Sequence, residues 1–143
     1  MSGAETARRG LVRQWLEKAT EDFDVAEFLD SHDAPYPHVI AFHAQQAAEK
    51  YLKALLSWRQ VEFPKTHDLA KLLDLLADSD PALADTLREA EELTPFGVDV
   101  RYPSALSKVP PAAARGALRL AAQVRTRILG LLTPELNADP PPG

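Results

Sequence analysis

The stretch FHAQQAAEKYLKALL, residues 42–56, decides the fold because it combines a wide apolar surface with an ordered set of polar groups. At about 100° per residue, apolar side chains before, within and just after this stretch recur on one helical face. That face consists of Ile40, Ala44, Ala47, Tyr51, Leu55 and Trp58, widened by Ala48, Leu52 and Ala54. A helix with so wide an apolar face usually lies in the centre of a fold. We therefore predict a central helix over residues 38–59.

A file of polar side chains runs along the same helix, at steps of three, four, three and four residues. It consists of His43, Gln46, Lys50, Lys53 and Ser57. One interpretation is that this file is the solvated side, with Glu49 and Lys53 forming an ordinary surface pair. The other is that the file is shielded. In that case a loop, a second subunit or a bound phosphate must satisfy it, because unpaired buried polar groups are costly.

Helical periodicity recurs along the rest of the 143-residue chain. Apolar residues from Val12 to Ala26 predict a first helix over residues 8–30. Thr66 is a plausible N-cap for a short leucine-rich helix, with Asp68 as an acid in its first turn. Asp80 followed by Pro81 predicts another helix start. A last helix is expected over residues 111–132, after a long proline-containing loop at 94–111.

These elements predict an all-α protein, an antiparallel up-and-down four-helix bundle with one additional short helix. We expect the bundle domain to occupy residues 1–132. The remainder, residues 133–143, is rich in proline and is expected to be a disordered tail.

Composition excludes several classes of function. The chain has no cysteine, and so neither a disulfide framework nor a thiolate metal site. Metal-binding histidine pairs, glycine-rich phosphate loops and nucleophile-elbow motifs are missing, so we expect no metal and no cofactor. No apolar run approaches the length of a membrane span, and the first ten residues lack a signal-peptide core. A cytoplasmic protein is the simplest expectation.

Charge is unevenly distributed. Residues 1–99 hold 10 basic and 19 acidic side chains, a net charge of −9, whereas residues 100–134 hold six basic and no acidic ones. Such a segment can meet phosphate, RNA or an acidic partner. It can equally meet the acidic part of its own fold or of a second copy. The arginines of the last helix, Arg115, Arg119, Arg125 and Arg127, are expected to form a solvated face, with only the first two aligned.

Three segments in this order resemble the HEPN (higher eukaryotes and prokaryotes nucleotide-binding) domain family. They are AFHAQQAAEKYLKALL at 41–56, THDLAKLLDLL at 66–76 and VRYP at 100–103. The resemblance spans about residues 12–131. It implies a helical bundle that forms homodimers, often paired with a separately encoded minimal nucleotidyltransferase in a toxin–antitoxin system. Active members are metal-independent ribonucleases, whose signature is Arg, then four to six residues, then His. In some pairs the nucleotidyltransferase adds AMP to a tyrosine near that histidine.

The ribonuclease signature is missing, because no arginine lies four to six residues before any of the four histidines. Our first hypothesis is therefore a homodimeric binding partner of a minimal nucleotidyltransferase that contacts nucleotide or nucleic-acid phosphate. A divergent ribonuclease toxin is the alternative, and a purely structural dimer is the third reading. Candidate residues for phosphate or partner binding are Arg101, Tyr102, His43, Gln46, Glu49, Lys50, Lys53 and His67. Arg101 has phosphate binding and an ion pair with Glu49 as its two readings.

Overall fold

The computed structural model describes residues 2–97 and 109–138, and every element within these ranges is helical. The long helices are α1 (Gly3–Ser31), α2 (Pro37–Trp58) and α5 (Pro111–Asn137). The short ones are α3 (Leu69–Ala77), α4 (Pro81–Thr86) and the 3₁₀ helix η1 (Arg88–Gly97). The all-α prediction is confirmed, but three helices are long where we expected four.

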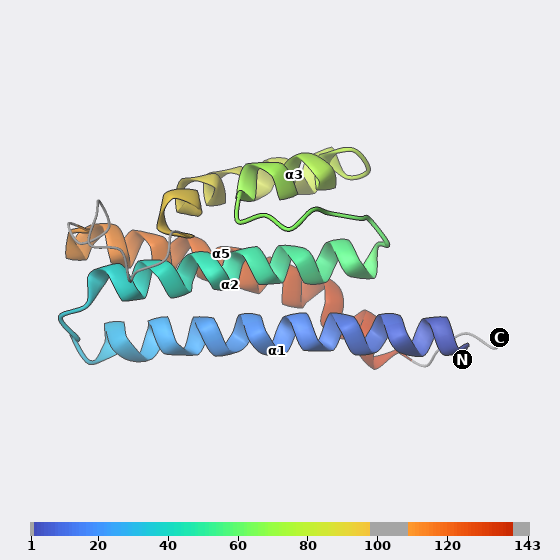
Figure 1. Ribbon diagram of the computed structural model, residues 1–143, viewed down its shortest axis with the longest axis horizontal. Coiled ribbons are helices and arrows are strands. Elements are labelled where there is room, and N and C mark those ends of the chain that lie inside the picture. The colour runs from blue at the N-terminus through green and yellow to red at the C-terminus, as the bar shows by residue number, and fades with distance from the viewer. Residues whose placement is uncertain (1, 98–108, 139–143) are drawn as a thin grey trace.

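Figure 1 shows how the chain runs. Helices α1 and α2 are antiparallel neighbours, and residues 59–68 return along α2 to the start of α3. The chain then runs back through α4 and η1, and α5 lies beside α2 in the same direction as α2. Helices α3, α4 and η1 form a layer over the α2–α5 side of the bundle. Within the described residues no helix is long and apolar enough to cross a membrane.

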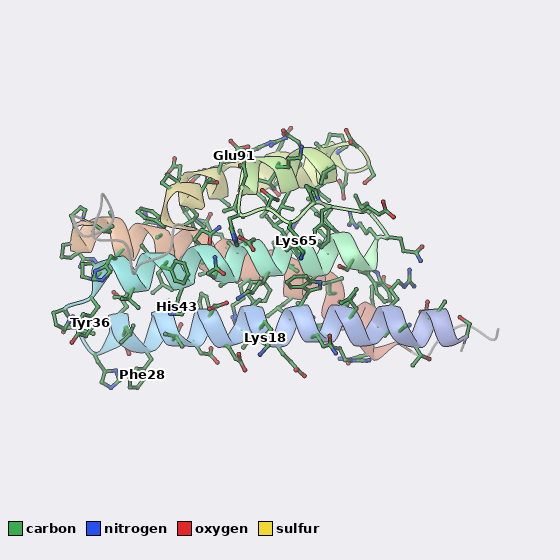
Figure 2. The ribbon with its side chains drawn as sticks, in the orientation of Figure 1. Lys18, Phe28, Tyr36, His43, Lys65 and Glu91 are labelled. Atoms are coloured by element: carbon green, nitrogen blue, oxygen red, sulfur yellow. The ribbon has the colours of Figure 1, made fainter. Side chains whose placement is uncertain are left out.

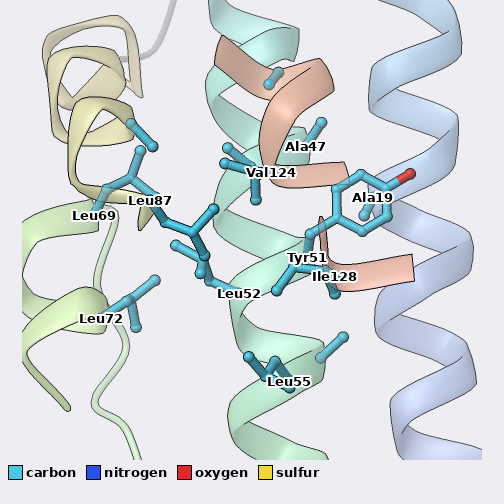
Figure 3. Packing of buried hydrophobic residues seen from close by; sticks show 14 of the residues in the cluster. Ala19, Ala47, Tyr51, Leu52, Leu55, Leu69, Leu72, Leu87, Val124 and Ile128 are labelled. Carbon is cyan, nitrogen blue, oxygen red and sulfur yellow. The ribbon is translucent and has the colours of Figure 1, made fainter. Parts of the chain in front are cut away.

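Helix α2 is the centre of the core, as its apolar face predicts. Thirteen of its 22 residues are buried, including the whole run from Tyr51 to Leu56. Figure 3 shows Tyr51 and Leu52 between Ala19 of α1, Val124 and Ile128 of α5 and the leucines of α3. Each buried leucine contributes about 1.5–3 kcal/mol through apolar surface removed from water. The first layer of the fold is therefore α1 and α5 packed on opposite parts of one central helix.

The predicted fourth long helix is replaced by α4 and η1. Asp80 caps α4 as expected, accepting a hydrogen bond from the Leu83 backbone N–H at 3.2 Å, and Pro81 is the first helical residue. The α-helical turns end at Thr86, and η1 continues with Pro95 inside it. Proline has no N–H to donate to the carbonyl four residues earlier, so an α-helix cannot continue through Pro95 without losing a hydrogen bond.

Two further boundaries differ from the prediction. The cap of α3 is Asp68 rather than Thr66, since the Asp68 carboxylate accepts from the Ala70 N–H at 3.0 Å. Helix α5 continues to Asn137, so residues 133–137, which we assigned to a disordered tail, are helical. Arg9 and Arg13 of α1 hold this end by donating to the carbonyl oxygen of Leu136 at 3.2 and 3.1 Å. Cationic side chains at a helix C-terminus also complement its dipole.

Candidate functional site

The most buried polar side chains of the described residues belong to α2 and face the segment 59–68. Gln45 has no exposed surface, and the side chains of Glu49 and Lys53 are 3% and 9% exposed. Lys53 donates from Nζ to Glu49 Oε2 and to the Thr66 carbonyl oxygen, both at 3.0 Å. The aromatic rings of Trp15 and Phe63 lie beside the same ammonium group. The pair that sequence spacing presented as an ordinary surface contact is therefore a shielded ion pair.

His67 joins this cluster from the segment that covers it. Its Nδ1 lies 2.8 Å from Glu49 Oε1, and its own carbonyl oxygen accepts from Gln45 Nε2 at 3.1 Å. A carboxylate only accepts hydrogen bonds, so the geometry assigns the proton to Nδ1. The His67 side chain is nevertheless 68% exposed. The cluster thus fixes one nitrogen of an accessible imidazole and leaves Nε2 without a partner among the described residues. We call Gln45, Glu49, Lys53 and His67 the Glu49 cluster.

Gln45 connects the Glu49 cluster to the end of η1. Its amide also donates to Glu49 Oε1 at 3.2 Å and accepts from Gln46 Nε2 at 2.7 Å. Gly97 packs directly on this amide, because a Cβ atom there would lie 2.9–3.1 Å from three Gln45 atoms. Position 97 therefore requires glycine unless the amide moves. Gln45 was not among our candidates, although a glutamine on so apolar a helix indicates a buried hydrogen-bonding role.

His43 and Lys50 belong to a second cluster, between α1 and α2 (Figure 2 labels His43). Asp22 of α1 accepts from Lys50 Nζ and lies 2.8 Å from His43 Nδ1. Burial alone would raise the pKa of the Asp22 carboxyl, but hydrogen bonds and opposite charges from His43 and Lys50 together hold its pKa below the usual value. Asp22 was not among the candidates either.

The structure therefore divides the predicted polar file between two internal partners. The segment 59–68 covers Lys53, and α1 covers His43 and Lys50. Gln46 and Ser57 are half-buried. Shielding of the file is confirmed, and both lysines already neutralise carboxylates within the same subunit. Arg101 and Tyr102 lie outside the described residues. In residues 2–97 and 109–138 no group of three or more metal-ligating side chains is positioned to hold an ion.

Comparison with solved structures shows two chains of the same fold, each with a TM-score of 0.65. One is ST0689, an archaeal HEPN homologue, which is 23% identical; the similarity covers 84% of this chain and 96% of that one. The other is TT1696 from Thermus thermophilus, which is 26% identical, with 83% and 96% covered. No curated protein matches the sequence.

The description of the HEPN domain matches residues 12–131, which include both polar clusters and all the helices that surround them. The matched segment has the extent that the residues around the Gln-Gln-Ala-Ala-Glu-Lys motif predict. The chain belongs to the HEPN domain family.

Proposed function

We propose that this protein is the homodimeric HEPN partner of a separately encoded minimal nucleotidyltransferase, and that it binds nucleotide or nucleic-acid phosphate. Membership of the HEPN family supports the pairing with a nucleotidyltransferase. The observation that carries phosphate binding is the imidazole of His67, which is exposed but fixed at Nδ1 by buried Glu49.

An imidazole held in this way suits an anionic ligand for two reasons. Its orientation is already fixed, so binding loses little side-chain entropy. In addition, the Glu49 carboxylate favours the protonated ring, in which Nε2 becomes a donor to a phosphate oxygen. Lys50 and Lys53 are poor alternatives, because each ammonium group already pairs with a carboxylate.

The experiment has two parts. Light scattering on the purified protein should give twice the chain mass of 15.7 kDa, and the minimal nucleotidyltransferase encoded beside it should co-purify. Calorimetry with ATP should then show weaker binding for His67→Gln. The matched control is His32→Gln, because His32 is also exposed and bonded through Nδ1, to the Phe28 carbonyl. A monomer that neither captures the nucleotidyltransferase nor binds ATP would end the proposal.

A second candidate function is a divergent metal-independent ribonuclease, and the His67–Glu49 pair is the observation that favours it. A carboxylate that orients a histidine is the usual support of a general base. Nε2 would take the proton of an RNA 2′-hydroxyl as O2′ forms its bond to phosphorus. The P–O5′ bond would break, O5′ would receive a proton from water, and the products would be a 2′,3′-cyclic phosphate and a 5′-hydroxyl.

Against this function stands the lack of a cation for the phosphate. Among the described residues no arginine lies within 4.0 Å of Glu49, and its lysine partner is buried. The discriminating assay incubates the purified protein with RNA and looks for the cyclic phosphate. Cleavage that disappears in His67→Gln and persists in His32→Gln would establish the ribonuclease, whereas intact RNA leaves the binding function.

A further inference from the structure

The outward face of α5 carries a groove that neither polar cluster uses. It has a volume of about 650 Å³ and is lined by residues of α5 alone. Its main residues are Arg119, Ala122, Gln123, Thr126, Arg127 and Gly130. We call it the α5 groove. Arg119 and Arg127 flank a floor of small side chains, and the two arginines are eight residues apart, about 12 Å along the helix.

The arginines of the α5 groove are exposed, and no described carboxylate lies within 4.0 Å of either one. Elsewhere most basic side chains are paired: Arg59 binds Asp80, Arg88 binds Asp74 and Glu91, and the α2 lysines bind Asp22 and Glu49. Arg127 does feel Asp80, whose pKa is lowered by the Arg59 hydrogen bond and, in smaller part, by the Arg127 charge. Arg127 nevertheless makes no ion pair with Asp80.

The composition of the groove indicates its ligand. It has two guanidinium groups, the hydrogen-bonding side chains of Gln123 and Thr126 between them, and no acid. From Pro111 to Pro134, α5 contains four arginines and no acidic residue. Residues 2–97 carry 10 basic and 18 acidic side chains, so a polyanion would be repelled by most of the remaining surface and attracted to this helix. Arginine and uncharged donors in a groove are the usual contacts to a phosphate backbone.

A second copy of the chain is a poor occupant of the α5 groove. A two-fold contact places a surface against itself. Because the groove holds two arginines and no acid, such a contact would bring like charges together in either relative orientation. The dimer of the proposed function therefore requires another surface.

We propose that the α5 groove is a docking site for single-stranded nucleic acid, with Arg119 and Arg127 contacting successive stretches of its phosphate backbone. The inference rests on the proposed function in taking a nucleic-acid ligand, but it places the main contact on α5, apart from His67. Gly130 at the groove floor allows close approach, because a Cβ added there meets nothing within 4 Å.

The test measures binding of a fluorescein-labelled twelve-uridine RNA to the full chain by anisotropy, across a range of salt concentrations. The double variant Arg119→Gln/Arg127→Gln should bind at least tenfold more weakly. The slope of log affinity against log salt should flatten by about two, or about one per lost phosphate contact. Arg88→Gln is the control, because it removes the same charge from an arginine already paired with two carboxylates. It should change affinity less than twofold.

A charge-neutral variant tests the shape of the groove. Gly130→Leu fills the floor and should weaken RNA binding several-fold while raising thermal stability, because leucine favours a helix over glycine. Gly10→Leu in α1 is the matched control, since a Cβ there also meets nothing within 4 Å. It should raise stability in the same way and leave RNA binding unchanged.

Three outcomes would overturn the inference. The wild-type chain fails to bind the RNA at low salt, the double variant binds with unchanged affinity and slope, or a twelve-glutamate peptide binds the groove and RNA does not. Loss of RNA binding in His67→Gln with no change in the double variant would retain the proposed function and remove the α5 groove. The reverse pattern would support the groove and remove His67 as the phosphate contact.

Discussion

Removing either member of the buried Glu49–Lys53 pair should destabilise the fold, and by unequal amounts. Glu49→Leu leaves the Lys53 ammonium, only 9% exposed, with the Thr66 carbonyl as its remaining hydrogen-bond partner. Orphaning a buried charge in this way costs about 3–5 kcal/mol. Lys53→Met leaves the Glu49 carboxylate with two donors, Gln45 Nε2 and His67 Nδ1. We therefore expect a smaller loss, about 1–3 kcal/mol.

The double variant Glu49→Leu/Lys53→Met separates a coupled pair from two independent costs. Replacing a buried ion pair by apolar residues of similar volume is often neutral. The double variant should accordingly be at least about 2 kcal/mol more stable than the sum of the two single losses predicts. Urea unfolding, followed by circular dichroism at one protein concentration, gives all four free energies of unfolding. The concentration is held constant because dimerisation would contribute to stability.

The matched control is the pair Lys18–Glu21 on the outer side of α1, 3.7 Å apart, with both side chains at least 67% exposed. The equivalent cycle, Glu21→Leu and Lys18→Met, should show coupling below about 0.5 kcal/mol. Additive losses at Glu49 and Lys53 within about 0.5 kcal/mol would refute the reasoning. So would a loss for Glu49→Leu that is no larger than the one for Glu21→Leu.

Three other measurements test the helix boundaries and the second cluster. The pKa of Asp22 is lowered in the fold, so its stabilising contribution is present above the ordinary value of 3.8 and lost as pH falls below it. The wild type should therefore lose its stability advantage over Asp22→Asn in acid titrations, and a constant difference down to low pH would contradict this. Asp68→Ala should cost about 1 kcal/mol in urea unfolding and more than Thr66→Ala, because Asp68 is the cap of α3. Ala47→Glu places a charge at a position with no exposed surface and should abolish the folded circular dichroism spectrum, whereas Ala112→Glu at an exposed position should not.

Local sequence patterns predict the centre of this fold well and its edges poorly. The apolar face of α2 follows from residue spacing alone, and Asp80–Pro81 marks a helix start through contacts within one turn. The α3 cap depends on a distant residue: Thr94 Oγ1 accepts from the Leu69 N–H at 3.2 Å. The end of α5 similarly depends on arginines more than 120 residues away. Neither partner is visible from periodicity. The start of α1 was a missed opportunity, because Ser2 and Glu5 have capping-box spacing.

The candidate site shows the same limit. Spacing identifies the polar file on α2 but not its partners, which come from Asp22 of α1 and from the backbone of the segment 59–68. It also presents Glu49 and Lys53 as a surface pair, since burial depends on a cover that periodicity does not describe. Conversely, Arg119 and Arg127 fall on different rows when plotted around α5, yet both line one groove. A groove can be wider than one row of helical positions.

The distribution of paired charge bears on where a ligand should be sought. Helix α2 has the more distinctive sequence, but its lysines are committed to Asp22 and Glu49, and releasing either one to bind phosphate would leave a shielded carboxylate unpaired. Helix α5 looks like an ordinary solvated face, yet its groove arginines can bind an anion without breaking an ion pair among the described residues. The two helices therefore have different roles. Helix α2 holds the segment that presents His67, and α5 offers the positive charge that is free for a polyanion.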